Sequence, residues 1–427
     1  MSAPDPTRRG VRAIVRALAP AVALVVLVSC TSAEEPTPPG SPLTFGTLLS
    51  MPERFDDEAR AGVRAAMLEL SWRDVEPEEG DFDEERLEDF ARGVADARAA
   101  GRTVTLGLGL HYTPDWVGDL EDGHYVDASG RRSEAANFVF SAAVRGAAED
   151  YVRRVARTVD LSSIAAVRLT SGGSPEVLYP GGGRFWAFNT GALSGDGLPA
   201  SMLPNPFPQW RPGGGGRLTP EQARAWVDWY VGGLVDVVRW QRELLAELRF
   251  DGDVHVLTPG SGVRPRRLER ALRSNLEDDL LGTGAVWQLL YDRLPADGRT
   301  VAFITSVADS SGGDDECAPG DAAVALTDPR ADGWSATRWI TRVATENGLR
   351  VSGENPGYGL PEELERSYRD GRDSGMMAAA FRQVASCGLE GLYWAHDAQL
   401  WNGTADWEQF AALVRGAQQG NPGGGRG

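Results

Sequence analysis

Eight short apolar runs recur along the chain, and long amphipathic segments separate most of them. Runs of this length are typical of buried strands, whereas the segments between them have the apolar spacing of helices. The strand-like runs cover residues 43–49, 63–70, 103–110, 164–170, 254–258, 300–306, 349–353 and 389–394. Strands that alternate with helices in this way favour an α/β fold with a parallel sheet.

The helical segments carry end signals that agree with this alternation. Gly101 suits the position after a helix, and Thr219 followed by Pro220 suits a helix start. The helices are predicted over residues 82–100, 141–159, 219–248, 264–281, 286–293, 335–347, 374–386 and 406–418. Eight strand–helix units predict a single (β/α)8 TIM barrel over residues 43–417, with a disordered tail at 418–427. A doubly wound open sheet is the alternative, but no G-x-G-x-x-G motif follows the first strand.

The composition is that of an acidic globular protein. Hydrophobic residues make up 42% and charged residues 24% of the chain, and the formal net charge is -18. A chain this acidic is not expected to bind nucleic acid and is better suited to uncharged or cationic ligands. All 43 basic residues are arginine, which excludes Schiff-base chemistry on lysine and a phosphate-binding P-loop. The 13 tryptophans supply flat aromatic faces on which sugar rings pack.

The N-terminus has the features of an export signal. Arginines precede an apolar run at residues 17–28 that is too short to span a membrane. The run ends at Leu27-Val-Ser-Cys30, which resembles a bacterial lipobox. The resemblance implies a lipoprotein signal peptide at residues 1–29, lipidation at Cys30, a flexible tether at 30–42 and an extracytoplasmic protein anchored to the bacterial cell membrane. We expect a monomer whose only membrane contact is this anchor; an ordinary signal peptide with a coincidental cysteine is the alternative.

Two cysteines remain beyond the signal, Cys317 and Cys387. In an oxidising compartment a disulfide has to be considered. Cys317 follows one predicted strand and Cys387 precedes another, which places them at opposite ends of a barrel and too far apart to bridge. We therefore predict two unpaired thiols. The histidines are scattered and no Cys/His spacing resembles a zinc site, so we predict neither a metal nor a cofactor.

Chemically distinctive residues gather directly after the predicted strands, at the positions that form the active face of a parallel barrel. The opposite strand ends have plain turns, such as Ala100-Gly-Arg and Glu346-Asn-Gly. A glycine-rich and aromatic insertion at residues 181–216 follows the fourth strand and is expected to lie over the pocket. The candidate substrate-binding residues on this face are Trp72, His111, Tyr112, Trp116, Tyr179, Asn355, Trp394, His396, Asp397 and Trp401.

Two glutamates are the candidate catalytic residues, on opposite walls of this face. Glu176 follows the fourth strand just after Gly172 and Gly173, and Glu354 follows the seventh. Two carboxylates in an aromatic cleft are what glycoside hydrolysis requires, because one donates a proton to the leaving oxygen while the other attacks the anomeric carbon or activates water. Burial among tryptophans raises the pKa of such an acid.

Each candidate also has a plain structural interpretation. Glu176 alone is compatible with a solvated loop, and Glu354 with a helix start or a salt bridge. Trp394 is compatible with a filler of the barrel's upper layer. The same applies to His111 and His396 as hydrogen-bonded spacers, and to Asp115 and Asp397 as helix caps.

The segment from Trp72 to Phe82 resembles the second β/α unit of barrel glycosidases, including the barrel β-galactosidases. Trp72, Glu76, Pro77, Gly80 and Phe82 match the pattern W-x-x-x-E-P-x-x-G-x-(F/Y). In the large clan of retaining glycosidases, the acid/base glutamate follows strand four and the nucleophile follows strand seven, which are the places of Glu176 and Glu354. That clan has asparagine directly before the first glutamate, where this chain has Pro175.

Two motifs are similar instead to the β-amylase family, which is also a (β/α)8 barrel with glutamates after strands four and seven. The stretch Gly173-Ser-Pro-Glu176-Val-Leu-Tyr179-Pro180 is similar to G-x-x-G-E-x-x-Y-P, with proline in place of the second glycine. The stretch Gly353-Glu354-Asn355-Pro356 is close to G-E-N-A. That family inverts configuration, with the first glutamate as general acid and the second as base.

The two resemblances imply a glycoside hydrolase that acts on an oligo- or polysaccharide through Glu176 and Glu354. They leave retention or inversion open, because the outcome depends on the carboxylate separation, roughly 5–5.5 Å for retaining and 6.5–9.5 Å for inverting enzymes. The alternative function is a lipid-anchored carbohydrate-binding protein that kept the barrel and lost catalysis. A barrel hydrolase of another class is disfavoured because the sequence has no nucleophile elbow.

Overall fold

The structure is a computed structural model that describes residues 43–420, except for residues 215, 309–315 and 358. The predicted signal peptide, Cys30, the tether up to residue 42 and the tail from residue 421 lie outside the described residues. So does Asp309, which follows the sixth predicted strand.

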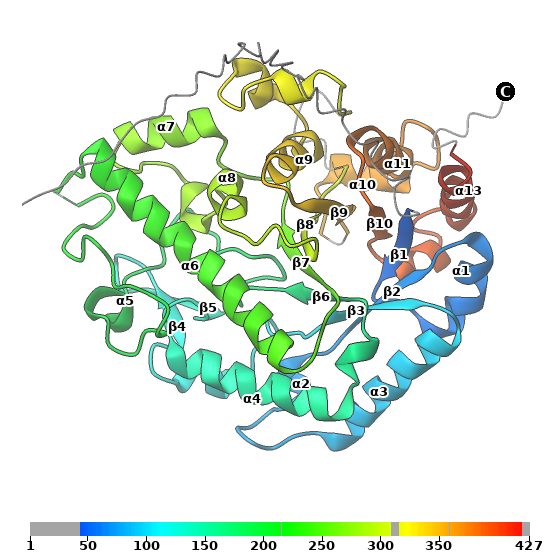
Figure 1. The fold of residues 1–427 in the computed structure, drawn as a ribbon, viewed down its shortest axis with the longest axis horizontal. Helices are drawn as coiled ribbons and strands as arrows, with labels where there is room; N and C mark the ends of the chain where they lie inside the picture. Colours follow the sequence, from blue (N-terminus) through cyan, green and yellow to red (C-terminus); the bar gives the residue numbers. More distant parts are fainter. Residues whose placement is uncertain (1–42, 215, 309–315, 358, 421–427) are drawn as a thin grey trace, which may run out of the picture. The chain divides into compact units, whose positions relative to one another are not determined.

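Eight parallel strands close into a barrel in the order β1-β10-β9-β8-β7-β6-β3-β2. Figure 1 shows them at the centre of a ring of helices. The barrel strands are β1 (Thr44–Leu48), β2 (Ala65–Glu69), β3 (Thr103–Gly107), β6 (Ala166–Leu169), β7 (Asp253–Thr258), β8 (Thr300–Ile304), β9 (Arg350–Glu354) and β10 (Gly391–Trp394). Each overlaps one of the eight apolar runs, so the predicted (β/α)8 barrel is confirmed.

The outer layer is helical, and several helices begin with the capping chemistry that the sequence indicates. Thr219 and Gln222 form a reciprocal capping box at the start of α6, with Pro220 in its first turn. The α-helices are α1 (Phe55–Ala61), α2 (Trp72–Val75), α3 (Glu84–Ala99), α4 (Ala142–Thr158), α5 (Thr190–Ser194), α6 (Pro220–Glu247), α7 (Pro265–Arg273), α8 (Trp287–Tyr291), α9 (Ala336–Glu346), α10 (Glu362–Arg369), α11 (Met376–Cys387), α12 (Asp397–Trp401) and α13 (Trp407–Gln418). Short 3-10 turns are η1 (Pro52–Arg54), η2 (Asp115–Asp119), η3 (Leu161–Ser163), η4 (Leu281–Thr283), η5 (Asp321–Ala323) and η6 (Pro329–Gly333).

Some elements differ from the sequence-based expectation. The helix expected at residues 264–281 ends at Arg273, because Asn275 and Leu276 both adopt left-handed backbone angles, with φ of 59° and 64°. Two consecutive residues in that region cannot continue a right-handed helix. The short helices α1 and α10 and an antiparallel hairpin, β4 (His124–Val126) with β5 (Arg132–Ala136), were not expected.

The barrel has a small interior core that is separate from the large core between strands and helices. In β2, Ala65 and Met67 belong to the interior cluster, whereas Ala66 belongs to the outer core. Side chains alternate between the two faces of a strand. The next inward position on β2 is therefore Glu69, at the carboxyl end of the strand, and this alternation builds the site described below.

The insertion after β6 is packed against α6. Its aromatic residues Phe185, Trp186 and Trp210 are buried. The ring of Phe185 lies 4.8 Å from that of Trp226 on α6, and Trp210 lies 5.0 Å from the same ring. The aromatic character of the insertion thus stabilises its attachment to the barrel.

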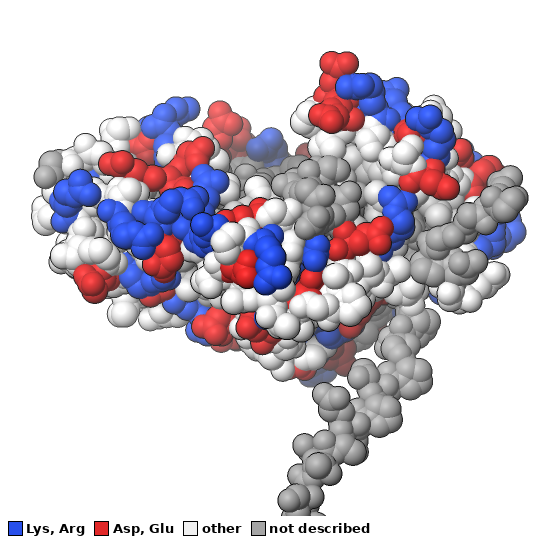
Figure 2. Space-filling view, turned by 90° about the horizontal axis from the view of Figure 1, so that it is seen from above, with Lys and Arg blue, Asp and Glu red and all other residues white. Residues whose placement is uncertain are grey.

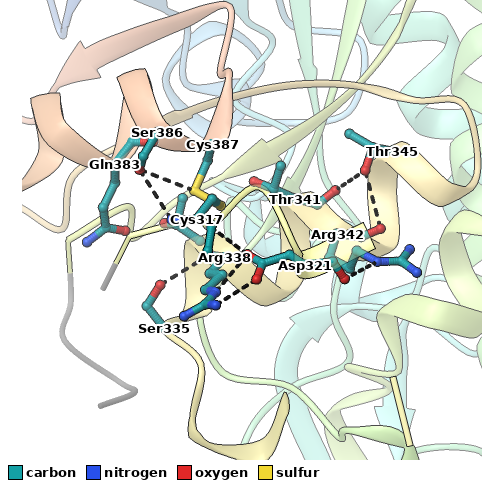
Figure 3. Close-up of a disulfide and its surroundings, with 12 residues drawn as sticks. Cys317, Asp321, Ser335, Arg338, Thr341, Arg342, Thr345, Gln383, Ser386 and Cys387 are labelled. Carbon is teal, nitrogen blue, oxygen red and sulfur yellow. Dashed lines mark hydrogen bonds and ion pairs between the residues drawn. A yellow bond between two sulfur atoms is a disulfide. The ribbon is translucent and has the colours of Figure 1, made fainter. Parts of the chain in front are cut away.

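Cys317 and Cys387 form a disulfide with a Cα–Cα distance of 4.9 Å, so the prediction of two unpaired thiols is wrong (Figure 3). The connection from β8 to α9 is long and reaches the C-terminal end of α11. The amide of Cys317 donates to the hydroxyl of Ser386, and Asp321 further along pairs with Arg338 on α9. Cys317 lies well beyond the end of β8 at Ile304, so its place in the chain does not fix it at that end of the barrel.

Candidate active site

A charged cluster occupies the carboxyl end of the barrel interior. Glu69 on β2, Arg168 on β6 and Glu354 on β9 each sit at an inward position near the end of their strand. Arg168 Nη1 donates to Glu354 Oε2 at 2.6 Å, and both side chains are buried. A charge-assisted hydrogen bond of this kind fixes the direction of the carboxylate.

A glycine makes room for this cluster. Gly107 on β3 is the register partner of Glu69 on one side and of Arg168 on the other. A Cβ atom added at Gly107 would lie 2.6 Å from Glu69 Oε1. Because Gly107 lacks a side chain, the Glu69 carboxyl occupies the space between β2 and β6.

The electrostatics of the cluster are set by burial and by mutual charges. Burial raises the pKa of Glu354, Arg168 lowers it through its charge and hydrogen bond, and the negative charge of Glu176 raises it again. Burial also raises the pKa of Glu69, with Arg168 opposing and Glu354 adding to the rise. The three carboxylates in turn raise the pKa of Arg168 by more than burial lowers it. Arg168 is therefore the cation that opposes the rise of both pKa values, although burial outweighs it and the pKa of each carboxyl group stays raised.

Glu176 lies on the loop after β6, half-exposed, with its backbone tied on both sides. Its carbonyl accepts from the Ser171 hydroxyl at 3.3 Å, and the amide of the next residue, Val177, donates to Leu257 at 3.0 Å. The carboxylate accepts a hydrogen bond from the hydroxyl of Thr305, just after β8, at 3.2 Å. Since its charge raises the pKa of Glu354, the structure brings the two glutamates predicted from the sequence into one cluster.

Two histidines and a tyrosine adjoin the charged residues. Burial and the positive charge of Arg168 lower the pKa of both His111 and His396 to about 4. Both imidazoles are therefore neutral at pH 7. The Tyr112 ring lies 4.0 Å from that of His111, and its hydroxyl donates to Glu69 Oε2 at 3.5 Å. His111 Nε2 is buried and has no hydrogen-bond partner among the described residues, which leaves it available to a ligand or water.

Three of the predicted substrate-binding aromatic residues are core residues. Trp72 is fully buried and donates its indole N–H to Glu76 at 2.8 Å. Tyr179 is buried in the aromatic layer under the insertion, with its hydroxyl donating to the Tyr230 carbonyl. Trp394 is fully buried and stacks at 5.1 Å on Tyr368. None of the three has surface for a sugar, which corrects the prediction for them.

Two polar candidates position loops. Asn355 is fully buried, with its Oδ1 accepting from the amide of Ala395 at 2.9 Å, so it joins the loops after β9 and β10. Asp397 is also fully buried and accepts from the amide of Met51 at 2.6 Å and from the indole of Trp401 at 2.8 Å. Neither is available to a substrate in this structure, which corrects the prediction for both.

The remaining two aromatic candidates are partly buried and lie outside the charged cluster. Trp116 donates its indole N–H to the Glu76 carbonyl at 3.2 Å. Trp401 donates to Asp397, and the guanidinium of Arg54 lies 4.5 Å above its ring. The residues that the structure does bring together are Glu176, Glu354, His111, Tyr112 and His396.

Glu69 and Arg168 were missed by the sequence analysis. Both belong to apolar strands. Glu69 stands two residues after Met67 of the interior cluster, and Arg168 stands two residues after Ala166, which pairs with Thr105 as Met67 does. A charged residue at an inward position of a barrel strand is the signal that was available. Applying the strand period to every polar residue inside the runs would have found them.

On the face in Figure 2, acidic and basic side chains are intermixed instead of forming a field of one sign. Within the described part of the chain, no group of three or more His, Cys, Asp or Glu side chains is arranged to hold a metal ion. No helix in that part is both long and apolar enough to cross a membrane.

Comparisons with solved structures place the fold. The chain is similar to the catalytic domain of β-amylase from Paenibacillus polymyxa, with a TM-score of 0.59 and 15% identity over 88% of this chain and 99% of that one. The chain shares its fold with glycosidases. The β-galactosidase from Marinomonas ef1 matches with a TM-score of 0.56 and 15% identity, and that from Halorubrum lacusprofundi with 0.54 and 17%.

Each of the two β-galactosidase matches covers 88% of this chain, which spans only 60% and 58% of the respective galactosidase chains. No protein-family model matches the sequence. A comparison with curated proteins finds no match either. The resemblance to barrel glycosidases that the motifs indicated is thus confirmed at the level of the fold.

Proposed function

We propose that this protein is a glycoside hydrolase that cleaves an oligo- or polysaccharide through Glu176 and Glu354. The observation that carries the proposal is the buried ion pair between Glu354 and Arg168, with a second carboxylate, Glu176, close enough to raise the pKa of Glu354. Glycoside hydrolysis needs two carboxyl groups in different protonation states. The similarity of the fold to β-amylase and β-galactosidases supports the same reaction class.

The surroundings assign different roles to the two carboxyl groups. Burial raises the pKa of Glu354, and the ion pair with Arg168 opposes this rise and directs the carboxylate, which suits a base or a nucleophile. Glu176 is half-exposed, contacts the Thr305 hydroxyl, and has no ion pair with an arginine among the described residues. Glu176 is therefore the proton donor to the leaving oxygen, and Glu354 attacks the anomeric carbon or activates a water molecule.

The neutral histidines complete the site. A sugar hydroxyl both donates and accepts hydrogen bonds, as does a neutral imidazole. The low pKa of His111 and His396 lets them serve as hydroxyl-binding groups near Arg168 without adding positive charge. Tyr112 adds an aromatic face next to His111, and neither a metal nor a cofactor is needed for this chemistry.

The test is cleavage of a broad panel of neutral glycans and aryl glycosides by the wild type and two variants. Glu176→Gln and Glu354→Gln are each expected to abolish cleavage, while Glu363→Gln, an exposed position on α10, keeps full activity. Folding is checked by the melting temperature of each variant. Full activity in both active-site variants refutes the assignment. The anomer released first, followed by NMR, decides between retention and inversion.

A carbohydrate-binding protein without catalysis is the second candidate. It is favoured by Pro175, which stands directly before Glu176 where both resembling families have another residue. Binding of oligosaccharides without turnover across the same panel supports this candidate.

We further propose that the protein is exported and anchored through a lipid on Cys30, as a monomer with no other membrane contact. The disulfide between Cys317 and Cys387 supports an oxidising compartment. The test is fractionation of cells that produce the full chain. Cys30→Ser is expected to move the protein from the membrane fraction to the soluble fraction, and an unchanged distribution contradicts the anchor.

A further inference from the structure

A groove of about 390 Å³ opens beside Glu69 at the mouth of the barrel. Residues that follow β1 and β3 form two of its sides, Leu49 and Tyr112, and Phe90 and Arg86 of α3 form another. Its volume is within the range of pockets that hold small ligands. Because Glu69 belongs to both, the groove is continuous with the charged cluster.

The groove gathers exposed apolar surface. Leu49 is 44% exposed and Tyr112 is 42% exposed, and among the described residues Leu203 is the only other large hydrophobic side chain that is exposed. Leu203 lies in the insertion, away from the residues that line the groove. Two of these three side chains thus line one groove, where they offer apolar surface to a ligand.

Leu49 is held in place at a conformational cost. Its φ of 53° lies in the left-handed region, which is unfavourable for leucine because its Cβ atom comes close to the following carbonyl oxygen. The neighbouring Ser50 is pinned, since its hydroxyl donates to the Thr47 carbonyl at 2.9 Å and accepts from the amide of Met67 at 3.1 Å. An exposed leucine in a strained, fixed conformation is a feature that binding explains and stability does not.

Tyr112 is held as firmly. Its amide donates to Gly109 at 2.9 Å, and its carbonyl accepts from Arg73 at 2.8 Å. Its hydroxyl contacts Glu69, so the ring is fixed at both ends. A rigid and exposed aromatic face loses little conformational entropy when a ring packs on it.

We propose that this groove binds a second sugar unit of the substrate, so that the protein acts on an uncharged oligosaccharide chain and not on isolated monoglycosides. The inference rests on the proposed function, because it extends the site of Glu176 and Glu354. Tyr112 and Leu49 cover the apolar face of that unit. Glu69 and Asp74 accept hydrogen bonds from its hydroxyls, and Arg86 donates to them.

The charge of the groove selects against acidic sugars. Glu69, Asp74 and Asp89 contribute three carboxylates to its wall, whereas Arg86 contributes one guanidinium. A uronic acid or a sulfated sugar would meet like charges at short range. The groove therefore suits neutral glycans.

The experiment compares kcat/KM for neutral oligosaccharides with kcat/KM for 4-nitrophenyl monoglycosides of the same sugar, using the full-length protein. Tyr112→Ala and Leu49→Asn are expected to lower the oligosaccharide-to-monoglycoside ratio by about 10- to 100-fold. Asparagine tolerates the left-handed backbone, so Leu49→Asn preserves the fold. Tyr112→Phe keeps the aromatic face and is expected to lower the ratio less than Tyr112→Ala does. Leu203→Asn is the matched control for loss of an exposed leucine and is expected to keep the ratio.

The outcomes distinguish failure of the groove proposal from failure of the proposed glycosidase function. If the wild type cleaves these substrates and both groove variants keep its ratio, the groove assignment is wrong and the proposed function stands. If the wild type cleaves nothing, calorimetric titration with the same oligosaccharides replaces the rates. Binding that Tyr112→Ala and Leu49→Asn abolish then supports the groove and refutes catalysis, and no binding refutes both. If uronic acid oligomers bind as tightly as neutral oligosaccharides do, the proposed preference of the groove for neutral glycans is wrong.

Discussion

Replacing Arg168 by methionine removes the cation that lies against Glu354 inside the barrel. The Arg168–Glu354 pair is buried, with an N–O distance of 2.6 Å. Removing one partner of a buried ion pair costs about 3–5 kcal/mol, because the other charge remains without compensation. We therefore expect Arg168→Met to lower the free energy of unfolding by about this amount at neutral pH.

The same substitution changes how Glu354 titrates. Without Arg168, burial and the charge of Glu176 both raise the pKa of Glu354, and nothing opposes them. A unit charge at close range contributes about 4 kcal/mol at an effective dielectric constant of ~20, so loss of Arg168 removes a large opposing interaction. We therefore expect the pKa of Glu354 to rise in this variant.

The assay is the pH dependence of kcat/KM. Glu354 acts as a carboxylate, so a raised pKa moves the acid limb of the profile to higher pH and leaves residual activity greatest in alkaline buffer. Arg145→Met is the matched control, because Arg145 forms a buried ion pair with Asp236 at 2.8 Å outside the site. It is expected to lose stability without moving the acid limb. An unshifted acid limb in Arg168→Met would refute the role of Arg168. If this variant is inactive at every pH, guanidinium is added to the assay, and the role of Arg168 is also refuted when guanidinium restores no activity.

Two further predictions concern stability. The Cys317–Cys387 disulfide closes a loop with a sequence separation of 70 residues. Replacing both cysteines by serine is expected to lower the free energy of unfolding, measured by denaturant titration, by about 4 kcal/mol. An unchanged free energy of unfolding contradicts this prediction. Burial and the charge of Asp397 raise the pKa of Glu58 to about 7, although Arg102 opposes the rise. The pKa of Glu58 is therefore higher in the folded than in the unfolded chain, so protonated Glu58 stabilises the fold. This stabilisation is complete below pH ~4.5 and is lost as the pH rises through 7, by up to about 3 kcal/mol. In thermal melts across pH 5–8, the stability of Glu58→Gln is expected to lack this dependence on pH. The same pH dependence in the variant and the wild type contradicts the prediction.

Much of the fold could be predicted because its signals are local. Each barrel strand is a short apolar run, and the turn and capping residues between them act within a few positions. The positions of the two glutamates could be predicted for the same reason, since Glu354 ends β9, Glu176 lies on the loop after β6, and the carboxyl ends of parallel strands meet on one face.

The substrate contacts could not be predicted in the same way. Three of the predicted contact residues follow or end strands, as a position at the active face demands: Trp72, Tyr179 and Trp394. All three nevertheless pack into the core between the barrel and the helices. Position along the chain places a residue at the correct end of the barrel. It does not say whether the side chain is directed at the axis or at the surrounding helices, which depends on the packing of both layers.

The amino-acid sequence by itself determined the barrel, the face of the site and the presence of Glu176 and Glu354 on it, because these follow from periodicity within single segments. The tertiary structure alone decided that Arg168 pairs with Glu354, that Gly107 makes room for Glu69, and that Cys317 reaches Cys387. Each of these contacts joins segments far apart in the chain. Their existence depends on strand register and on the course of a long loop, which no local pattern specifies.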